Sequence, residues 1–297
     1  VNEPPVVTIH PLDITVCKNS LALFNVNALN SDSYQWQESV GSGWIDMTEN
    51  AFYSGVTEPN LKVFTTTGMN GFRYRCRVVN GNCPDTTNFA RLFVNPTPTL
   101  QIVTGGGSFC EGGSGLPIGL ADSEAGIAYH LSRNGTSTGI VVSGTGEAIS
   151  LGTFTQAGNY TVRAINGSTG CAIPMHNSVQ IIINPLPLQQ SIMGGGSFCS
   201  GSLPPEIFLS SSQQNIVYTL HKNGLSTGQT LEGTGFTLSF GNISETGFYT
   251  VSARNISSNC AVQMNGNVQI IQNEIPQVFA GADQAIAPGT TAILSAQ

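Results

Sequence analysis

The stretch GNYTVRAINGSTGC at residues 158–171 returns as GFYTVSARNISSNC at residues 247–260, an offset of 89 residues. The run GGGSFC at residues 105–110 returns at residues 194–199 with the same offset. A period of this length is too long for a solenoid repeat and is close to the size of one small domain. The sequence therefore predicts a single type of domain duplicated in tandem.

Short apolar stretches alternate with polar residues throughout the chain and are bounded by Gly, Asn, Ser or Pro. Examples are residues 21–26, 72–79, 160–165 and 179–183. Period-two alternation with frequent turn residues is typical of antiparallel strands. No segment has the apolar spacing of an amphipathic helix, so we expect an all-β protein.

The first part of the chain carries the residues of an immunoglobulin-like sandwich. Trp36 stands where such folds place a core tryptophan on the third strand, and Tyr74 precedes Cys76 by two residues, as in a tyrosine corner. The later repeats keep Tyr160 and Tyr249 at the corner position. We predict tandem immunoglobulin-like β-sandwich domains in an elongated array.

Junctions that contain proline divide the chain near residues 96, 185 and 276. Because they are short and proline restricts the backbone, neighbouring domains should be stiffly joined. Both ends of the sequence resemble internal parts of a repeat, so we expect a segment of a larger array. The predicted organisation is the tail of a preceding domain at 1–4, domains at 5–96, 97–185 and 186–275, and the start of a further domain at 276–297.

The composition excludes several classes of protein. Charged residues make up 9% of the chain and the net charge is −7, whereas nucleic-acid-binding proteins carry clustered Lys and Arg. No apolar run approaches the roughly 18 residues needed to span a bilayer. A hydrophobic content of 40% is nevertheless sufficient for folded cores.

The cysteines recur with the repeats. Cys110 and Cys171 lie 61 residues apart, as do Cys199 and Cys260, and each of these two domains contains only its own pair. The economical interpretation is one disulfide within each domain. Disulfides imply an oxidising compartment outside the cytoplasm.

The first domain has three cysteines. Alignment of the repeats places Cys83 near Cys171 and Cys260, and places Cys76 at a core position. We therefore predict a Cys17–Cys83 disulfide, with Cys76 a buried free thiol that packs as a small hydrophobic residue. The alternative is Cys17–Cys76, although Val26 occupies the site expected for the second-strand cysteine of that bridge.

We find no catalytic, cofactor or metal site in the sequence. The glycine runs lack the G-K-[ST] of a phosphate-binding loop, the acidic residues lack the spacing of a calcium loop, and the cysteines lack the close pairs of a zinc site. No histidine recurs at the repeat offset or falls in a nucleophile or metal motif. The four histidines are His10, His130, His176 and His221.

Two surface positions are candidates for contact or modification. Asp85-Thr86-Thr87 has the form of a short O-glycosylation motif of secreted bacterial proteins, which makes Thr86 the candidate acceptor. Trp44 lies in a polar stretch and is a candidate for contact with a glycan. The alternative for Trp44 is that it covers the edge of the sandwich.

The run from Tyr34 to Gln37, the run from Tyr74 to Cys83, and Gly158 to Val162 followed by Cys171 resemble a known group of repeats. They are similar to the Ig-like and PKD-like repeats of large cell-surface proteins from the Bacteroidota, many of them substrates of the type IX secretion system. This resemblance implies an extracellular, outer-membrane-associated location. It also implies surface glycans or other cell-surface and secretion-system proteins as partners.

The leading hypothesis is a non-catalytic stalk segment of a large secreted cell-surface adhesin, for gliding motility or surface attachment. One alternative is an accessory spacer on a secreted hydrolase or protease. Another is a structural segment of a surface filament or of a secretion-system substrate. The tandem repeats and the lack of a recognisable site favour the first, because fold alone does not decide among them.

Overall fold

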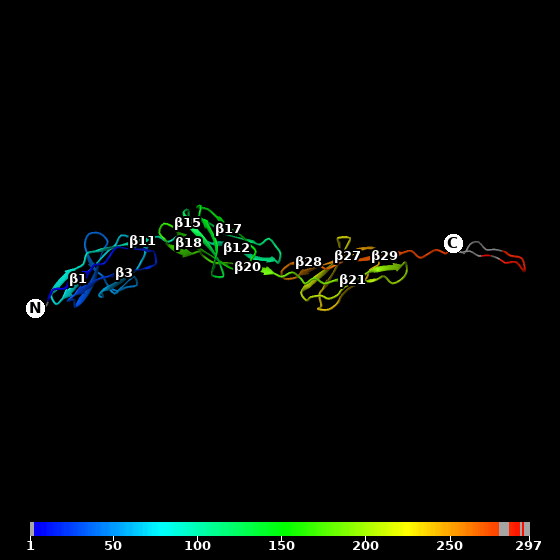
Figure 1. The fold of residues 1–297 in the computed structure, drawn as a ribbon, viewed down its shortest axis with the longest axis horizontal. Coiled ribbons are helices and arrows are strands. Elements are labelled where there is room, and N and C mark those ends of the chain that lie inside the picture. Colours follow the sequence, from blue (N-terminus) through cyan, green and yellow to red (C-terminus); the bar gives the residue numbers. More distant parts are fainter. Residues whose placement is uncertain (1–2, 279–284, 292, 294–297) are drawn as a thin grey trace. The chain divides into compact units, whose positions relative to one another are not determined.

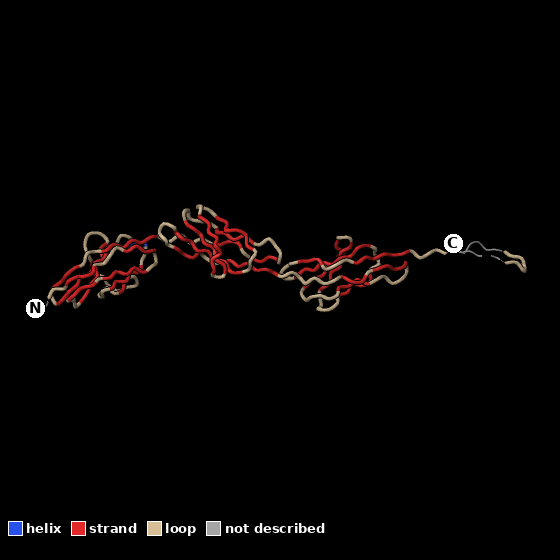
Figure 2. The backbone as a smooth tube through the Cα atoms, in the orientation of Figure 1, coloured by secondary structure: helices blue, strands red, loops and turns tan. Residues whose placement is uncertain are grey.

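The computed structural model describes residues 3–278, 285–291 and 293. The described residues contain strands and one 3-10 turn but no α-helix, as predicted (Figures 1 and 2). The described residues form two compact units. One contains residues 3–107 and 114–182, and the other contains residues 108–113 and 183–278. Much of the further domain expected at 276–297, and half of the tail expected at 1–4, lies outside the described residues.

The first repeat is a sandwich of a long sheet and a short sheet. The long sheet has the order β2-β11-β9-β5-β6, with β10 also paired to β9, and the short sheet has the order β3-β8-β7. β1 pairs with β4, and β2 runs parallel to β11. Its elements are β1 (Val6–Ile9), β2 (Ile14–Cys17), β3 (Leu21–Asn25), β4 (Asn27–Leu29), β5 (Ser33–Ser39), β6 (Ile45–Asp46), β7 (Tyr53–Ser54), β8 (Asn60–Phe64), the 3-10 turn η1 (Thr67–Met69), β9 (Arg73–Asn80), β10 (Cys83–Thr86) and β11 (Ala90–Asn95).

The second repeat has a short sheet, β12-β14-β17, and a long sheet, β13-β20-β18-β15-β16, with β19 paired to β18. Its strands are β12 (Val103–Gly105), β13 (Gly107–Cys110), β14 (Leu116–Leu120), β15 (Ile127–Arg133), β16 (Thr136–Ser143), β17 (Ile149–Phe154), β18 (Gly158–Asn166), β19 (Ala172–Pro174) and β20 (Val179–Asn184).

The third repeat has the same two sheets, β21-β23-β26 and β22-β29-β27-β24-β25, with β28 paired to β27. β22 ends at Cys199 and runs parallel to β29, the last strand, just as β2 ends at Cys17 and runs parallel to β11 in the first repeat. Its strands are β21 (Ile192–Gly194), β22 (Gly196–Cys199), β23 (Glu206–Leu209), β24 (Ile216–Lys222), β25 (Leu225–Glu232), β26 (Leu238–Asn242), β27 (Gly247–Asn255), β28 (Ala261–Gln263) and β29 (Val268–Asn273).

The core of the first repeat forms around Trp36, as the sequence predicts. Trp36 is fully buried, and its indole N–H donates a hydrogen bond to the carbonyl oxygen of Glu58 at 2.8 Å. Phe24 packs between the two large side chains, with its ring centroid 6.4 Å from Trp36 and 5.0 Å from Tyr74. A buried indole needs such a partner for its N–H, and the turn between β7 and β8 supplies it. The fold is an immunoglobulin-like sandwich.

The tyrosine corner differs among the repeats. The hydroxyls of Tyr160 and Tyr249 each donate to a carbonyl oxygen four residues upstream at 2.8 Å, that of Gln156 and that of Glu245. The hydroxyl of Tyr74 is buried and has no hydrogen-bond partner among the described residues. The corner hydroxyl is therefore hydrogen-bonded in the later two repeats and has no partner among the described residues in the first.

The glycine run of the second repeat lets its first strand change sheets. Gly105 ends β12 in the short sheet, and Gly107 begins β13 in the long sheet. Gly105 and Gly106 have φ of +93° and +73°, which L side chains rarely adopt. A Cβ on Gly106 would lie 2.7 Å from the carbonyl oxygen of Gln180. The run is therefore a structural switch point, not a phosphate-binding loop.

Candidate functional site

Both disulfides of the structure join consecutive repeats. Cys17 at the end of β2 is bonded to Cys171 of the second repeat, with their Cα atoms 5.6 Å apart. Cys110 at the end of β13 is bonded to Cys260 of the third repeat, with a Cα–Cα distance of 5.5 Å. Each bond lies within one of the two compact units, because Cys110 belongs to the segment that clusters with the third repeat.

The predicted pairs Cys17–Cys83, Cys110–Cys171 and Cys199–Cys260 are therefore wrong, and the alternative Cys17–Cys76 is wrong as well. The presence of disulfides was predicted, but they run between domains and not within them.

The reason lies in the geometry of the long sheet. In the first repeat, Cys17 lies opposite Asn95 at one end of the sheet, and Cys83 lies opposite Asn80 at the other end. The pairing of Tyr74 with Ala90 lies between them, six residues from Asn80 and five from Asn95. About eleven residues of extended strand span roughly 35 Å, whereas a disulfide requires Cα atoms within about 7 Å. A bridge between these two cysteines cannot form.

The second cysteine of each repeat occupies one position in the fold. Cys83 pairs with Asn80, the last residue of β9. The backbone N–H of Asn166, the last residue of β18, donates to the carbonyl oxygen of Cys171 at 2.8 Å. Asn255, the last residue of β27, makes the same bond to Cys260, also at 2.8 Å. The alignment of Cys83 with the later two was therefore correct, although the bonding partner was not.

Cys76 is buried and forms no disulfide. It lies opposite Trp36 in the strand register, in the interior of the first sandwich. Burial raises the pKa of its thiol to about 12, because a charged thiolate is costly to desolvate. Cys83 and Cys199 are also unbridged, but both are exposed.

Trp44 belongs to a cluster of arginine and aromatic side chains on the outer face of the long sheet of the first repeat. The guanidinium of Arg75 lies 4.2 Å from the centroid of the Trp44 ring. The ring of Phe89 lies 6.2 Å from that of Trp44, centroid to centroid. The guanidinium groups of Arg73 and Arg91 lie 5.3 and 5.9 Å from the centroid of Phe89. We call these five residues the arginine–aromatic face.

The alternation of β9 produces this face. Tyr74, Cys76 and Val78 point into the core, so the residues that alternate with them along β9 point outward. Those residues are Arg73, Arg75 and Arg77. Arg91 lies directly opposite Arg73 on β11. Four of the ten basic residues of this acidic chain therefore lie together.

The three arginines of the arginine–aromatic face form no salt bridge in the described part of the chain, and the Asp13 carboxylate accepts a hydrogen bond from the backbone N–H of Arg91 at 2.7 Å. Arg77 lies 3.9 Å from Asp46 in an exposed ion pair, and Arg75 donates a hydrogen bond from Nε to the neutral side chain of Gln37 at 2.7 Å. Like charges directly opposite one another in a sheet are destabilising. Arg73 and Arg91 have this arrangement. A bound anion would reduce the repulsion between their two positive charges.

Thr86 lies on β10 with its side chain exposed, next to the buried Thr87. The hydroxyl of Thr87 accepts a hydrogen bond from the backbone N–H of Cys76 at 2.9 Å. Of the two adjacent threonines, only Thr86 is accessible, and its glycosylation stays a prediction.

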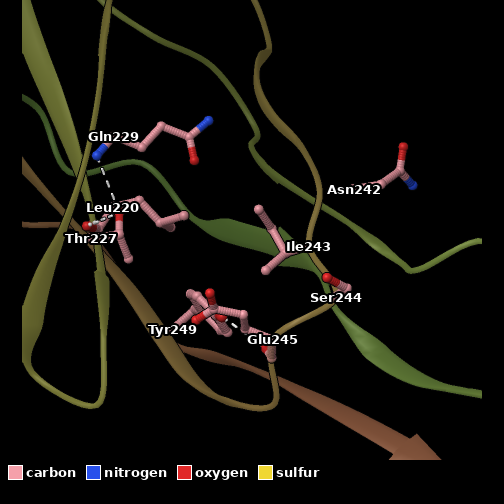
Figure 3. A pocket seen from close by; sticks show the side chains of 8 residues that line it. All are labelled: Leu220, Thr227, Gln229, Asn242, Ile243, Ser244, Glu245 and Tyr249. Atoms are coloured by element: carbon pink, nitrogen blue, oxygen red, sulfur yellow. Dashed lines mark hydrogen bonds between the residues drawn. The ribbon is translucent and has the colours of Figure 1, made fainter.

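The third repeat has a surface groove between β25, the end of β26 and the start of β27 (Figure 3). The pKa of Glu245 is lowered because Lys222 donates to its carboxylate at 2.7 Å. The hydroxyl of Thr227 donates to the carbonyl oxygen of Leu220 at 2.9 Å, so the groups of the groove already have structural partners. A groove in the second repeat is lined by seven of the eight equivalent residues, 89 positions earlier, with Arg133 in place of Leu131. The lining residues are Leu220, Thr227, Gln229, Asn242, Ile243, Ser244, Glu245 and Tyr249.

The histidines do not gather into a site. Nε2 of His221 lies 2.8 Å from the hydroxyl oxygen of Ser252 on the neighbouring strand, and no carboxylate hydrogen-bonds to His221 in the described part of the chain. The backbone N–H of Asn88 donates to Nδ1 of His10 at 3.1 Å. Across residues 3–278, no three His, Cys, Asp or Glu side chains lie close enough to hold a metal ion together. The described part also contains no helix that could cross a membrane.

No protein-family model matches this chain, and no curated protein matches its sequence. Three solved structures of tandem immunoglobulin domains are similar in architecture. A three-domain fragment of titin, an E-to-A variant, is 14% identical with a TM-score of 0.42, over 91% of this chain and 99% of that chain.

Extracellular domains 3–5 of Drosophila OTK are 13% identical with a TM-score of 0.34, over 92% of this chain and 98% of that chain. Sidekick-1 immunoglobulin domains 1–5 are 16% identical with a TM-score of 0.26, over 94% of this chain and 61% of that chain. With TM-scores below 0.5, these likenesses say nothing about function. The disulfides of this chain favour an oxidising location outside the cell.

Proposed function

We propose that this chain is a non-catalytic stalk segment of a large secreted cell-surface adhesin, for surface attachment or gliding motility. The observation that supports the proposal is the covalent joining of consecutive repeats by Cys17–Cys171 and Cys110–Cys260. A bridge within a domain limits extension only by the loop that it closes in that domain. A bridge between domains limits extension as well and also cross-links two consecutive domains, which suits a stalk under tension.

The two disulfides interleave along the sequence. A force applied to the two ends passes along residues 1–17, crosses to Cys171, returns along the chain to Cys110 and crosses to Cys260. After complete unfolding, the force-transmitting path contains roughly 115 residues, or about 400 Å at about 3.5 Å per residue. Without the disulfides the whole chain extends to about 1,000 Å.

Single-molecule pulling tests this proposal. We expect the oxidised chain to stop extending near 400 Å and the chain treated with a reductant to reach about 1,000 Å. Cys17→Ser removes only the first bridge and should give an intermediate length. An oxidised chain that extends as far as the reduced one would exclude a tension-limiting role.

For the attachment itself we propose an acidic polysaccharide bound at the arginine–aromatic face. Arg75 covers a face of the Trp44 ring at 4.2 Å, so Trp44 positions this arginine for the glycan, and direct contact of Trp44 with a sugar stays a prediction. Negatively charged groups complement the opposed Arg73 and Arg91. Such binding is electrostatic and weakens as salt screens the charges.

Binding to immobilised heparin, a sulfated polysaccharide, tests the attachment proposal. The double variant Arg73→Gln with Arg75→Gln should lose most of its retention at low salt. Arg163→Gln, an exposed arginine on β18 outside the face, is the matched control and should be retained like the original chain. Equal retention of all three proteins would refute the proposed site.

A further inference from the structure

The three cysteines that end β2, β13 and β22 have the same surroundings. Cys17 and Cys199 pair with Asn95 and Asn273, the last residues of β11 and β29. In every repeat the residue after the cysteine donates its N–H to the carbonyl oxygen of the asparagine that ends the last strand. These bonds are Lys18 to Asn95 at 2.8 Å, Glu111 to Asn184 at 2.9 Å, and Ser200 to Asn273 at 3.0 Å. Cys199 therefore has the local backbone geometry of the two bonded cysteines.

The partner cysteines are equally alike. Cys83, Cys171 and Cys260 each lie opposite an asparagine that ends β9, β18 or β27. This position is at the opposite end of the long sheet from the first set. In both observed bridges, a cysteine of the first set is bonded to a cysteine of the second set in the following repeat.

Cys199 and Cys83 are the members of each set that remain unbonded, and both are exposed. We propose that they are the two halves of the same inter-repeat bridge. Cys199 bonds to a cysteine of an immunoglobulin-like repeat that follows. That cysteine is the one equivalent to Cys171 and Cys260. Cys83 takes the cysteine at the Cys17 position of a repeat that precedes. This inference rests on the proposed stalk function and extends it to a continuous ladder of bridges.

Partners within the same repeat are excluded. In the third repeat, Cys199 pairs with Asn273 while Cys260 is hydrogen-bonded to Asn255, at opposite ends of the sheet. Cys260 is also already bonded to Cys110. Cys76 lies inside the first sandwich, out of reach of any exposed thiol. Only a neighbouring repeat provides a cysteine in the position that the observed bridges use.

The bond forms by two thiol–disulfide exchanges with a small-molecule disulfide such as oxidised glutathione. The thiolate of Cys199 attacks one sulfur, forms a mixed disulfide and releases one glutathione thiolate. The thiolate of the partner cysteine then attacks the Cys199 sulfur and releases the second. The two cysteines lose two electrons and two protons in total, and the oxidant becomes two thiols.

A chain extended by one repeat tests the proposal for Cys199. A second copy of residues 185–273, placed after Asn273, recreates the connection that follows Asn184 in the natural chain. In the added copy, Cys199→Ser removes its own unpaired thiol, and the exposed Ala261→Ser marks its peptide by mass. After refolding with oxidised glutathione, we expect a peptide that links Cys199 to Cys260 of the added copy.

The control carries Cys260→Ser in the added copy as well. Thiols counted in denaturant should number two with the bridge, from Cys76 and Cys83, and three in the control. Four thiols in the test protein, or a link from Cys199 to Cys260 of its own repeat, would overturn the proposal. The bridges Cys17–Cys171 and Cys110–Cys260 are mapped in the same digest. Their presence without the new bridge refutes the ladder alone, whereas their absence refutes the stalk proposal.

A second variant tests Cys83 independently of the first. A copy of residues 3–95 that carries Cys83→Ser is placed ahead of residue 3. Cys83 of the original first repeat should then become unreactive and be found linked to Cys17 of the copy. Continued alkylation of Cys83 would contradict the proposal at this end, even if the C-terminal extension fails to fold.

Discussion

Cys17 and Cys171 are 154 residues apart in the sequence, yet their Cα atoms lie 5.6 Å apart. The bond joins the end of a strand parallel to β11 with the turn that follows β18 in the next repeat. These are opposite ends of two equivalent sheets, so each repeat offers one cysteine at each end. This polarity makes the disulfide a connector between domains.

Site-specific proteolysis distinguishes this pairing from bridges within domains. A cleavage sequence inserted between Thr97 and Pro98 cuts between the first and second repeats, and one inserted after Leu186 cuts between the second and third. We expect the fragments from either cut to stay together on a non-reducing gel and to separate after reduction. Separation without a reductant would show that the bridges lie within repeats.

The three free thiols should differ sharply in reactivity. At pH 8, Cys83 and Cys199 should react with a thiol reagent in the native protein, while Cys76 should react only in denaturant, because burial raises its pKa to about 12. The folded state holds this proton more tightly than the unfolded state, whose cysteine pKa is about 8.5. The stabilisation is therefore complete below about pH 8.5 and is lost as the pH rises toward 12.

Labelling followed by peptide mapping checks the thiol prediction. Cys76→Ala is the control, because it removes the thiol that should react only in denaturant. Rapid native labelling of Cys76 at pH 8 would contradict its burial. The loss of stability of the first repeat at high pH is followed by tryptophan fluorescence, since Trp36 and Trp44 both belong to that repeat.

Removing the corner hydroxyl should destabilise the later two repeats but not the first. Tyr160→Phe and Tyr249→Phe each lose a hydrogen bond and should lower the free energy of unfolding by about 1 kcal/mol. Tyr74→Phe removes a buried hydroxyl that has no partner among the described residues. It should leave the stability unchanged or raise it by about 1 kcal/mol.

Chemical denaturation checks the tyrosine prediction, with tryptophan fluorescence for the first repeat and calorimetry for the other two. If Tyr74→Phe lowers the free energy of unfolding as much as Tyr160→Phe does, the Tyr74 hydroxyl must have a hydrogen-bond partner, such as a buried water.

The glycines of the second repeat should tolerate substitution only where there is space. At Gly105 a Cβ would overlap the carbonyl oxygen of Pro117, and φ is +93°, whereas at Gly112 φ is +81° and the surroundings are open. Gly112→Ala should cost about 1–2 kcal/mol from backbone conformation alone. Gly105→Ala should cost about 1–3 kcal/mol more, because the overlap must be relieved. Calorimetry of the second repeat measures both, and equal costs would contradict the sheet-switching role.

Residue pattern alone determined the strands, the sandwich and the buried positions of Trp36 and Cys76. These follow from local alternation, since a side chain's face depends only on its place along a strand. The equivalence of Cys83 with Cys171 could also be predicted, because the repeats preserve the spacing from the corner tyrosine.

The disulfide partners and the arginine–aromatic face were decided by tertiary structure. Sequence spacing showed that Cys110 and Cys171 belong to one repeat, but not that the sheet holds such cysteines at opposite ends. Likewise, Trp44 and Arg75 lie far apart in sequence, and only the pairing of β5 with β6 and β9 brings them into contact. A disulfide depends on distance in space, and that distance is set by how whole strands and successive domains are arranged.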